Sequence, residues 1–129
     1  MNRLLFLMCI VSIVSCKQFV KSQTKIVSPE EVQELMKHEN VQILDVRTPK
    51  EYDEGFIEGA KNISFYSSTF STDIEVLDKH KPIIVYCKMG GRSAKSAKIM
   101  KDIGFTEVYD LEGGITKWKL KRKPIKTKH

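Results

Sequence analysis

Cysteine is scarce in this sequence, with three residues among 129: Cys9, Cys16 and Cys87. No Cys-x-x-Cys pair is present, which excludes the usual dithiol redox enzymes. Histidine is equally scarce, and the three histidines have no partner at metal-ligand spacing. We therefore expect neither a metal site nor an organic cofactor.

An excess of basic charge is also missing from most of the chain, although the formal net charge is +6. Seven of the 22 Lys and Arg residues lie in the last thirteen positions, which leaves 15 basic residues against 16 acidic ones. We expect residues 121–129 to form a solvated, frayed basic tail. Attraction to anionic lipid head groups and weak steering of anionic substrates are the alternatives.

No apolar run is long enough to cross a bilayer as a helix, which takes about 20 residues. The longest run has eleven residues, 4–14, and follows the positively charged start Met1-Asn2-Arg3. A short positive head before such a run is typical of a signal peptide, which we place at residues 1–15. A permanent transmembrane anchor is the weaker interpretation.

The segment Ile13-Val14-Ser15-Cys16 resembles the lipobox of bacterial lipoproteins. It predicts that Cys16 is lipidated and opens a linker over residues 16–24; the alternative is an ordinary cleaved signal with an incidental cysteine. On the first interpretation the protein lies in the cell envelope, held at a membrane by its lipid and facing the periplasm or the exterior. Such a location disfavours nucleic acid as a partner. Cys87 is then the lone cysteine of the mature domain, so no internal disulfide forms.

The rest of the chain alternates strand and helix patterns, which predicts one α/β domain over residues 25–120. We expect a small, mainly parallel central sheet flanked by helices on both faces. The predicted strands are 25–27, 41–46, 60–63, 83–86 and 107–109. The predicted helices begin after the caps Ser28 and Thr48, and three more cover 73–79, 93–103 and 115–120. The expected apolar side of the helix 93–103 consists of Ala94, Ala97, Met100 and Ile103.

Cys87 directly follows the continuous apolar run 83–86, which predicts a central strand covered on both faces. Ligands of parallel sheets bind beyond the carboxyl ends of the strands, where we expect this cysteine. The loop Cys87-Lys88-Met89-Gly90-Gly91-Arg92 contains two glycines that let its amides point inward, and the next helix adds its positive end. A free thiol ionises at about pH 8.5, and these surroundings favour a nucleophilic thiolate over an inert cysteine in a glycine turn.

The spacing between Cys87 and Arg92, C-x4-R, separates two chemistries that use a cysteine in such a loop. Cysteine-dependent phosphatases use C-x5-R-[ST], a loop one residue longer that surrounds a tetrahedral phosphoryl group. The shorter loop makes a tighter ring, which suits a smaller anion such as the terminal sulfur of a persulfide on the cysteine itself. Phosphatase activity therefore stays as a less favoured hypothesis.

Several motifs occur in the order found in one known family. They are Leu44-Asp45-Val46-Arg47; Glu51-Tyr52 with Gly55, Ile57, Gly59-Ala60 and Asn62-Ile63; Val85-Tyr86-Cys87 with Gly90 and Arg92-Ser93; and Leu111-Glu112-Gly113-Gly114 with Trp118. On these residues the chain resembles the single-domain rhodanese-like sulfurtransferases from about residue 27 to residue 119. It departs from them at Phe56, where the family often has histidine.

The resemblance implies that Cys87 attacks a small anionic sulfur donor such as thiosulfate, holds the sulfur as a persulfide, and passes it to cyanide or a thiol. Substrate binding is then expected from the residues that follow: Lys88, Met89, Gly90, Gly91, Arg92 and Ser93. The resemblance also implies that Asp45 supports the sheet edge beside the loop and that Arg47 pairs locally with a carboxylate; substrate contact is the alternative for each. We expect a monomer. The rival hypothesis, from a different class, is a non-catalytic sulfur-carrier or protein-interaction module.

Overall fold

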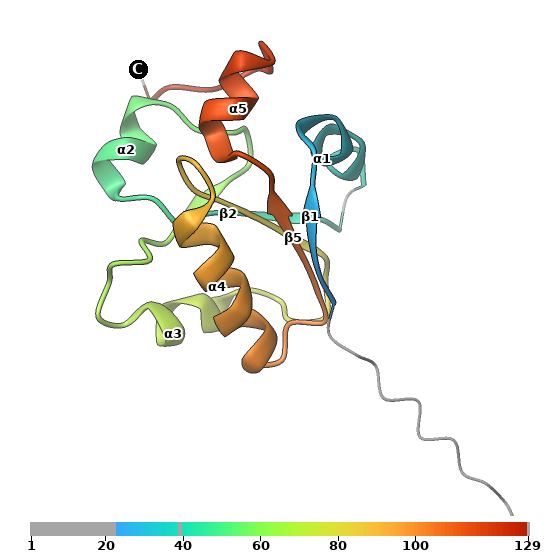
Figure 1. Ribbon diagram of the computed structural model, residues 1–129. Helices are drawn as coiled ribbons and strands as arrows, with labels where there is room; N and C mark the ends of the chain where they lie inside the picture. The colour runs from blue at the N-terminus through green and yellow to red at the C-terminus, as the bar shows by residue number, and fades with distance from the viewer. Residues whose placement is uncertain (1–22, 39, 129) are drawn as a thin grey trace, which may run out of the picture.

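Five parallel strands form the centre of the structure, a computed structural model that describes residues 23–38 and 40–128 (Figure 1). The strands are β1 (Gln23–Val27), β2 (Gln42–Asp45), β3 (Lys61–Asn62), β4 (Ile83–Tyr86) and β5 (Glu107–Leu111). Their order across the sheet is β1-β5-β4-β2-β3, and every neighbouring pair runs parallel. The predicted signal peptide, the lipidation of Cys16 and most of the predicted linker lie outside the described residues.

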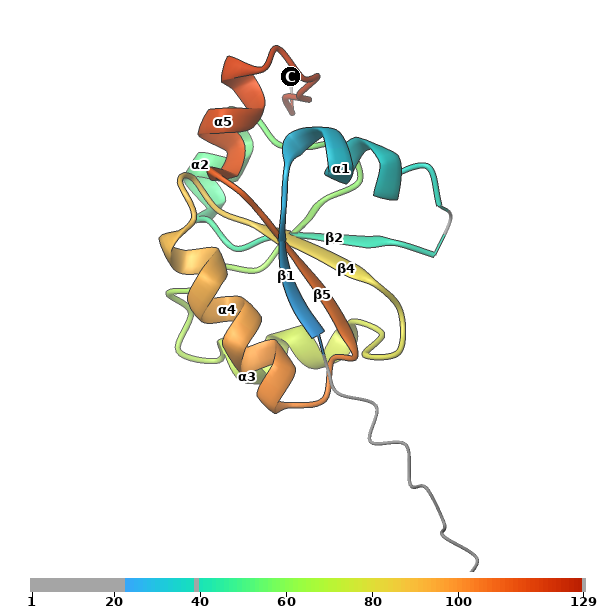
Figure 2. The same ribbon diagram turned by 45° about the vertical axis from the view of Figure 1, so that its right-hand side comes forward.

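Helices cover both faces of the twisted sheet, as Figure 2 shows, which confirms the predicted fold class. The helices are α1 (Pro29–Leu35), α2 (Pro49–Glu54), α3 (Phe70–Asp73), the 3-10 turn η1 (Ile74–Val76), α4 (Gly91–Asp102) and α5 (Gly114–Leu120). Side chains of α1 and α5 pack in the apolar cluster on one face, and those of α3, η1 and α4 pack in the cluster on the other. None of the described helices has the length and apolar character needed to span a membrane.

Local capping starts the first two helices where the sequence predicts. Ser28 Oγ accepts a hydrogen bond from the Glu31 N–H at 3.1 Å, and Pro29 occupies the first turn. Thr48 and Glu51 form a complete capping box, in which each side chain accepts from the other residue's N–H at 3.3 Å. Because Thr48 follows β2 closely, this box fixes the start of α2 and the position of Glu51.

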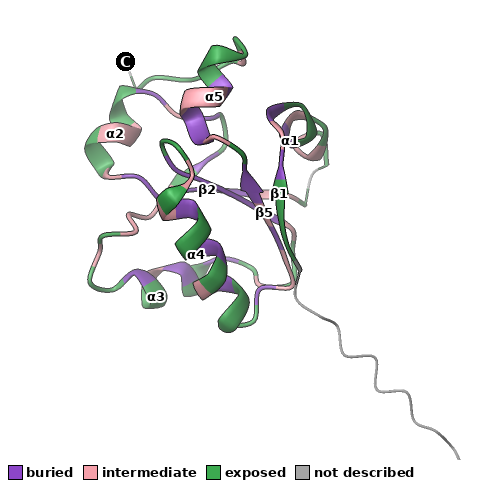
Figure 3. Ribbon diagram, viewed as in Figure 1, coloured by how far each residue is buried: buried purple, intermediate pink, exposed green. Residues whose placement is uncertain are grey.

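Strand β4 lies in the middle of the sheet, and all four of its residues are buried, as its continuous apolar run predicts (Figure 3). Side chains alternate between the two faces along a strand. Ile83 and Val85 therefore pack with α4, whereas Ile84 and Tyr86 pack with α1 and α5. Cys87 continues the alternation on the α4 side. The cysteine thus emerges from the central strand directly beside the start of α4.

The helix predicted at 73–79 is displaced toward the N-terminus, since α3 starts at Phe70 and η1 ends at Val76. Buried Phe70 and Ile74 anchor these turns to the core. Asp73 Oδ2 accepts hydrogen bonds from Thr69 Oγ1 at 2.9 Å and from a serine hydroxyl at 3.2 Å. Local hydroxyl bonds of this kind stabilise irregular turns, and they give no periodic signal in the sequence.

Helix α4 begins at Gly91, two residues before the predicted start. Its buried face also differs from the prediction, because Ala94 is exposed. The buried positions are Ser93, Ser96, Ala97 and Met100. Two serines therefore face the core, and each hydroxyl has a hydrogen-bond partner there.

The basic tail is not frayed in its described part, contrary to the expectation. Phe56 and Lys126 form an antiparallel bridge, in which the Phe56 N–H donates at 2.9 Å and the Lys126 N–H donates at 2.8 Å. Buried Trp118 donates from Nε1 to Pro124 O at 2.8 Å. Lysines of the tail pair with carboxylates on α2 and just after it. The charge that suggested a solvated end is offset by these acidic neighbours.

Candidate active site

Cys87 is the first residue after β4, and it is 1% exposed. It is the free cysteine found among residues 23–38 and 40–128. The cysteine lies at the carboxyl edge of the central strand, where ligands of parallel sheets bind. A three-residue turn, 88–90, then leads directly into α4.

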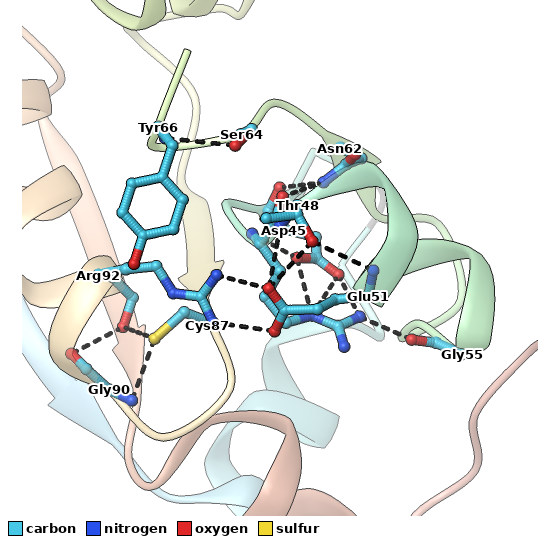
Figure 4. Close-up of polar contacts among 12 residues, drawn as sticks. Asp45, Thr48, Glu51, Gly55, Asn62, Ser64, Tyr66, Cys87, Gly90 and Arg92 are labelled. Atoms are coloured by element: carbon cyan, nitrogen blue, oxygen red, sulfur yellow. Dashed lines mark hydrogen bonds and ion pairs between the residues drawn. The ribbon is translucent and has the colours of Figure 1, made fainter.

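Gly90 supplies the backbone donor that reaches the sulfur within the described chain. Its N–H lies 3.0 Å from Cys87 Sγ (Figure 4). Gly90 has a φ of 119°, a left-handed conformation that residues with side chains rarely adopt, so this turn requires glycine. Helix α4 starts at the next residue, Gly91, and the first N–H groups of a helix lack partners within it. The dipoles at this helix end favour negative charge on the sulfur.

Helix α5 holds the backbone of the cysteine from the other side. The Ile115 N–H donates to Cys87 O at 2.9 Å, and the Thr116 N–H donates to Lys88 O at 3.0 Å. A Cβ atom at Gly114 would overlap both of these carbonyl oxygens. Close contact with the loop therefore requires the glycine that opens α5.

A buried hydroxyl and a buried carboxyl group lie behind the sulfur. Ser93, in the first turn of α4, places Oγ 3.5 Å from Cys87 Sγ and donates to Asp110 Oδ1 at 2.7 Å. Asp110 lies on β5 and is 6% exposed. Burial raises the pKa of the Asp110 carboxyl above its usual value, and the hydrogen bond from Ser93 opposes that shift.

Arg92 is engaged by Glu51 of α2 in a bidentate ion pair. Its Nη1 lies 2.7 Å from Glu51 Oε1, and its Nη2 lies 2.9 Å from Oε2 (Figure 4). The guanidinium also lies 5.5 Å from the ring centroid of the exposed Tyr66. The hydrogen bond from Arg92 is the main cause that lowers the pKa of Glu51 to about 2. The pair therefore stays charged at neutral pH and joins the end of the cysteine loop to α2.

Lys88 and Met89 form the outer turn of the loop, and both are exposed. Lys88 lines a small cavity of about 120 Å³ to which α2 and α5 also contribute. The other lining residues are mostly charged or polar: Arg47, Glu51, Glu54, Ile115, Thr116 and Lys119. Of the six predicted binding residues, Gly90 and Ser93 contact the sulfur, whereas Lys88, Met89, Gly91 and Arg92 lie in the loop or at the start of α4 without a hydrogen bond to it.

Asp45 and Arg47 form a buried ion pair at the end of β2. Arg47 Nη2 lies 2.6 Å from Asp45 Oδ2, and the two side chains are 4% and 0% exposed. The same Nη2 donates to Gly55 O at 2.6 Å, and Asn62 Nδ2 donates to Arg47 O at 2.8 Å. The Arg47 guanidinium also lies 5.7 Å from the ring centroid of Tyr86. These contacts join β2 to the turn after α2 and to β3, and none of them reaches the cysteine sulfur.

Two residues of this site are not assigned to it by the sequence patterns, Asp110 and Glu51. Asp110 lies two positions after buried Val108 on β5, so the two side chains point to the same face of the sheet. A carboxyl group at such an inward-facing position is the signal that the sequence offers. Glu51 occurs among the family motifs and in the capping signature that starts at Thr48, but neither gives it a partner in the cysteine loop. Its contact with Arg92 spans 41 residues and depends on how α2 and α4 meet, which no local pattern reveals.

The fold and the site define a class of protein: a parallel α/β domain with one cysteine at the carboxyl end of its central strand, in a short loop that leads into a helix. No group of three His, Cys, Asp or Glu side chains in the described residues is arranged to hold a metal ion. Residues 28–121 match the family described as the rhodanese-like domain. The chain belongs to this family.

Known proteins agree with this assignment. The chain is 38% identical over 95 residues to the thiosulfate sulfurtransferase GlpE of Coxiella burnetii, which covers 74% of this chain and 87% of that protein. It is 36% identical over 81 residues to the uncharacterized protein YqhL of Bacillus subtilis, and it spans 63% of the length of that relative. The crystal structure of a rhodanese-related protein from Thermoplasma volcanium aligns with a TM-score of 0.71 at 28% identity, covering 79% of this chain and 97% of that one.

Proposed function

We propose that this protein is a sulfurtransferase that moves a sulfane sulfur from a thiosulfate-like or persulfide donor to a thiol or cyanide through a persulfide on Cys87. The observation that carries the proposal is the position of the sulfur. Sγ accepts the Gly90 N–H at 3.0 Å, immediately before the amino end of α4. A thiolate and a persulfide anion are both stabilised by fixed donors of this kind. The similarity to GlpE, which bears the name thiosulfate sulfurtransferase, supports the same reaction.

The reaction has two steps at one sulfur atom. The Cys87 thiolate first attacks the outer sulfur of thiosulfate, so that a new S–S bond forms on Cys87. The S–S bond of thiosulfate breaks, and sulfite leaves with the electron pair. Cyanide or an acceptor thiolate then attacks the terminal sulfur, the persulfide bond breaks, and the Cys87 thiolate returns. The protein contributes a fixed nucleophile and donors to its anionic forms.

The state of Arg92 supports sulfur transfer over phosphoryl transfer. In the cysteine-dependent phosphatases, the arginine of the C-x5-R loop binds the oxygens of the tetrahedral phosphoryl group. Here Glu51 holds both terminal nitrogens of Arg92, at 2.7 Å and 2.9 Å. The short loop and the paired arginine therefore favour a small sulfur species bound at Cys87.

The test of the proposal is to treat the full chain with thiosulfate, a thiosulfonate or a polysulfide, each of which carries a sulfane sulfur, and to measure its intact mass. We expect a mass gain of one sulfur atom, which cyanide then releases as thiocyanate. The Cys87→Ser variant is the control and gains no cyanolysable sulfur. A wild-type protein that forms no such adduct with any of the three donors contradicts the proposal.

A sulfur carrier or interaction module is the second candidate, favoured by the 1% exposure of Cys87. A buried persulfide is protected from solvent but is reached slowly by an acceptor. A carrier would load with sulfur and then show negligible turnover with cyanide or thiols. Steady-state rates therefore separate the two candidates, and loss of partner binding in Cys87→Ser without measurable turnover in wild type favours the carrier.

We also propose that the protein acts as a monomer in the cell envelope, anchored through a lipid on Cys16. The support is the segment Ile13-Val14-Ser15-Cys16 after a short apolar run. Intact-mass analysis of the membrane fraction should show the lipid, and Cys16→Ser should release the protein from that fraction. Wild-type protein without added lipid mass would contradict this location.

A further inference from the structure

Asp110 is a buried carboxyl group to which the proposed reaction gives no role. Its side chain faces α4, and among the described residues it accepts a hydrogen bond from Ser93 and has no ion-pair partner. Its neighbour on β4, Val85, is apolar and fully buried, and Asp110 itself is 6% exposed. A carboxyl group in such surroundings holds a proton more readily than it does in water, and burial accordingly raises the pKa of Asp110.

Ser93 connects this carboxyl group to the thiol. Its Oγ lies 2.7 Å from Asp110 Oδ1 and 3.5 Å from Cys87 Sγ, and it also lies 3.2 Å from Gly90 O. Ser93 is 0% exposed. A hydroxyl group carries one proton and donates one hydrogen bond, but it has two lone pairs for accepting others. The direction of the Ser93 O–H therefore decides whether the sulfur faces a donor or an acceptor.

The protonation state of Asp110 sets that direction. When Asp110 is ionised, the Ser93 O–H donates to it, and only oxygen lone pairs face the sulfur, which favours an S–H that donates to Ser93. When Asp110 is protonated, its own O–H donates to Ser93 Oγ, and the Ser93 O–H is free to turn to Gly90 O or to a thiolate, of which the charged sulfur is the stronger acceptor. One proton thus fits two arrangements: a thiol with a carboxylate, or a thiolate with a carboxylic acid.

We propose that Asp110 is a positioning residue that takes up the proton of Cys87 through Ser93. The S–H proton moves to Ser93 Oγ while the Ser93 proton moves to Asp110 Oδ1, so that one S–H and one O–H bond break and two O–H bonds form. The product is a thiolate near a neutral carboxylic acid. The buried sulfur becomes nucleophilic without a second negative charge beside it. The role in sulfur transfer rests on the proposed function, since the thiol then attacks a donor without releasing its proton to solvent.

The charged groups on the elements around the sulfur include Arg92, Glu51 and Lys88. Arg92 on α4 pairs with Glu51 on α2; this pairing lowers the pKa of Glu51 to about 2 and raises that of Arg92. Lys88 is exposed on the loop. The proton shared by Cys87 and Asp110 therefore controls the reactivity of the sulfur.

The test is the pH dependence of alkylation by iodoacetamide in the full chain, followed on the Cys87 peptide by mass spectrometry. This reaction needs no sulfur transfer, so its outcome is independent of the proposed function. We expect two steps with a plateau between them in wild type, because two groups that share a proton titrate as a coupled pair. Asp110→Asn keeps the shape but stays neutral. Its profile should have one step, about one pH unit or more below the upper wild-type step.

Glu107→Gln is the matched control, since it removes a carboxylate from the same strand and should keep the wild-type profile. Ser93→Ala removes the connecting hydroxyl and should abolish the plateau although Asp110 remains. Circular dichroism checks that each variant is folded. A wild-type profile with one step, or a plateau that survives in Asp110→Asn or in Ser93→Ala, overturns the proposal.

Discussion

Two arginine–carboxylate pairs contact α2 or the turn that follows it, and they differ in burial and in the sequence separation of their members. Arg47 and Asp45 are two residues apart, and their side chains are 4% and 0% exposed. Arg92 and Glu51 are 41 residues apart, and their side chains are 17% and 26% exposed. The first pair joins β2 to the turn after α2, and the second joins the cysteine loop to α2. The same kind of ion pair thus stabilises the fold in one place and borders the reactive sulfur in the other.

Burial explains the difference. Desolvation lowers the pKa of Arg47, but the hydrogen bonds and the charge of Asp45 outweigh it and leave that pKa raised. Removing one member of such a pair leaves a buried, uncompensated charge, which costs far more than the pair contributes. Water reaches both Arg92 and Glu51, which form the outer pair. Either residue can therefore lose its partner at a smaller cost in free energy. The outer pair can therefore respond to an anion at the loop.

The largest effect is expected from Arg47→Leu. It leaves the Asp45 carboxylate buried without its partner, and we expect the free energy of unfolding to fall by about 3–5 kcal/mol. Urea unfolding measures this loss. The double variant with Asp45→Asn should recover part of it, because the uncompensated charge is gone. A loss below about 1 kcal/mol in Arg47→Leu would show that burial does not set the cost of breaking these pairs.

The next effect is expected from Arg92→Met, and it falls on activity. The Glu51 carboxylate is left unpaired near the sulfur, where it repels an anionic donor. We expect kcat/KM for thiosulfate to fall roughly five- to thirtyfold, equal to about 1–2 kcal/mol. Adding Glu51→Gln removes the repelling charge and should restore part of the rate. Unchanged kcat/KM in Arg92→Met would show that the Arg92–Glu51 pair has no role in the reaction.

A smaller effect is expected from Glu51→Gln, and it depends on pH. The pKa of Glu51 in the folded protein is about 2, below its ordinary value of 4.5, chiefly because of the hydrogen bond from Arg92. A lowered pKa adds stability that is complete above the ordinary value and is lost as the pH falls through 2. After allowance for solvent, we expect a loss of about 1 kcal/mol at neutral pH.

Urea unfolding of wild type and Glu51→Gln at several pH values checks this expectation. The two free energies should differ at neutral pH and converge as the pH approaches 2. A difference that is constant with pH would assign the loss to the capping box at Thr48 rather than to the charge of the pair. Glu54→Gln, on the exposed last turn of α2, is the control for removing a carboxylate from that helix.

The sequence predicts most of the framework because its signals are local. The caps at Ser28 and Thr48, and the apolar run 83–86, each act within a few residues, and the structure has elements at all three places. The helix at 73–79 is misplaced because hydroxyl bonds around Asp73 compete with the apolar pattern. The tail is solvated as predicted but is not frayed, because its backbone pairs with Phe56 and its lysines find acidic partners more than sixty residues earlier.

The site is predicted less completely, for a related reason. The position of Cys87 follows from its place after a strand, and the need for glycine at position 90 follows from the turn. Asp110 and Glu51 join the site only through strand order and helix packing. β5 lies between β4 and β1 in the sheet, and this position brings Asp110 behind the sulfur. Such contacts are set by topology, which residue spacing alone does not determine.

The smallest effect on the free energy of unfolding is expected from breaking an exposed ion pair on the surface, between Lys79 and Glu75. Lys79 Nζ lies 2.8 Å from Glu75 Oε2, a distance similar to those in the other two pairs, yet the side chains are 29% and 50% exposed. Water screens this pair, so Lys79→Gln should cost less than about 0.5 kcal/mol in urea unfolding. At about 1 M salt even this difference should vanish, whereas the loss in Arg47→Leu should persist, because buried charges are screened much less. An exposed pair that cost as much as the buried one would show that distance, rather than burial, governs these interactions.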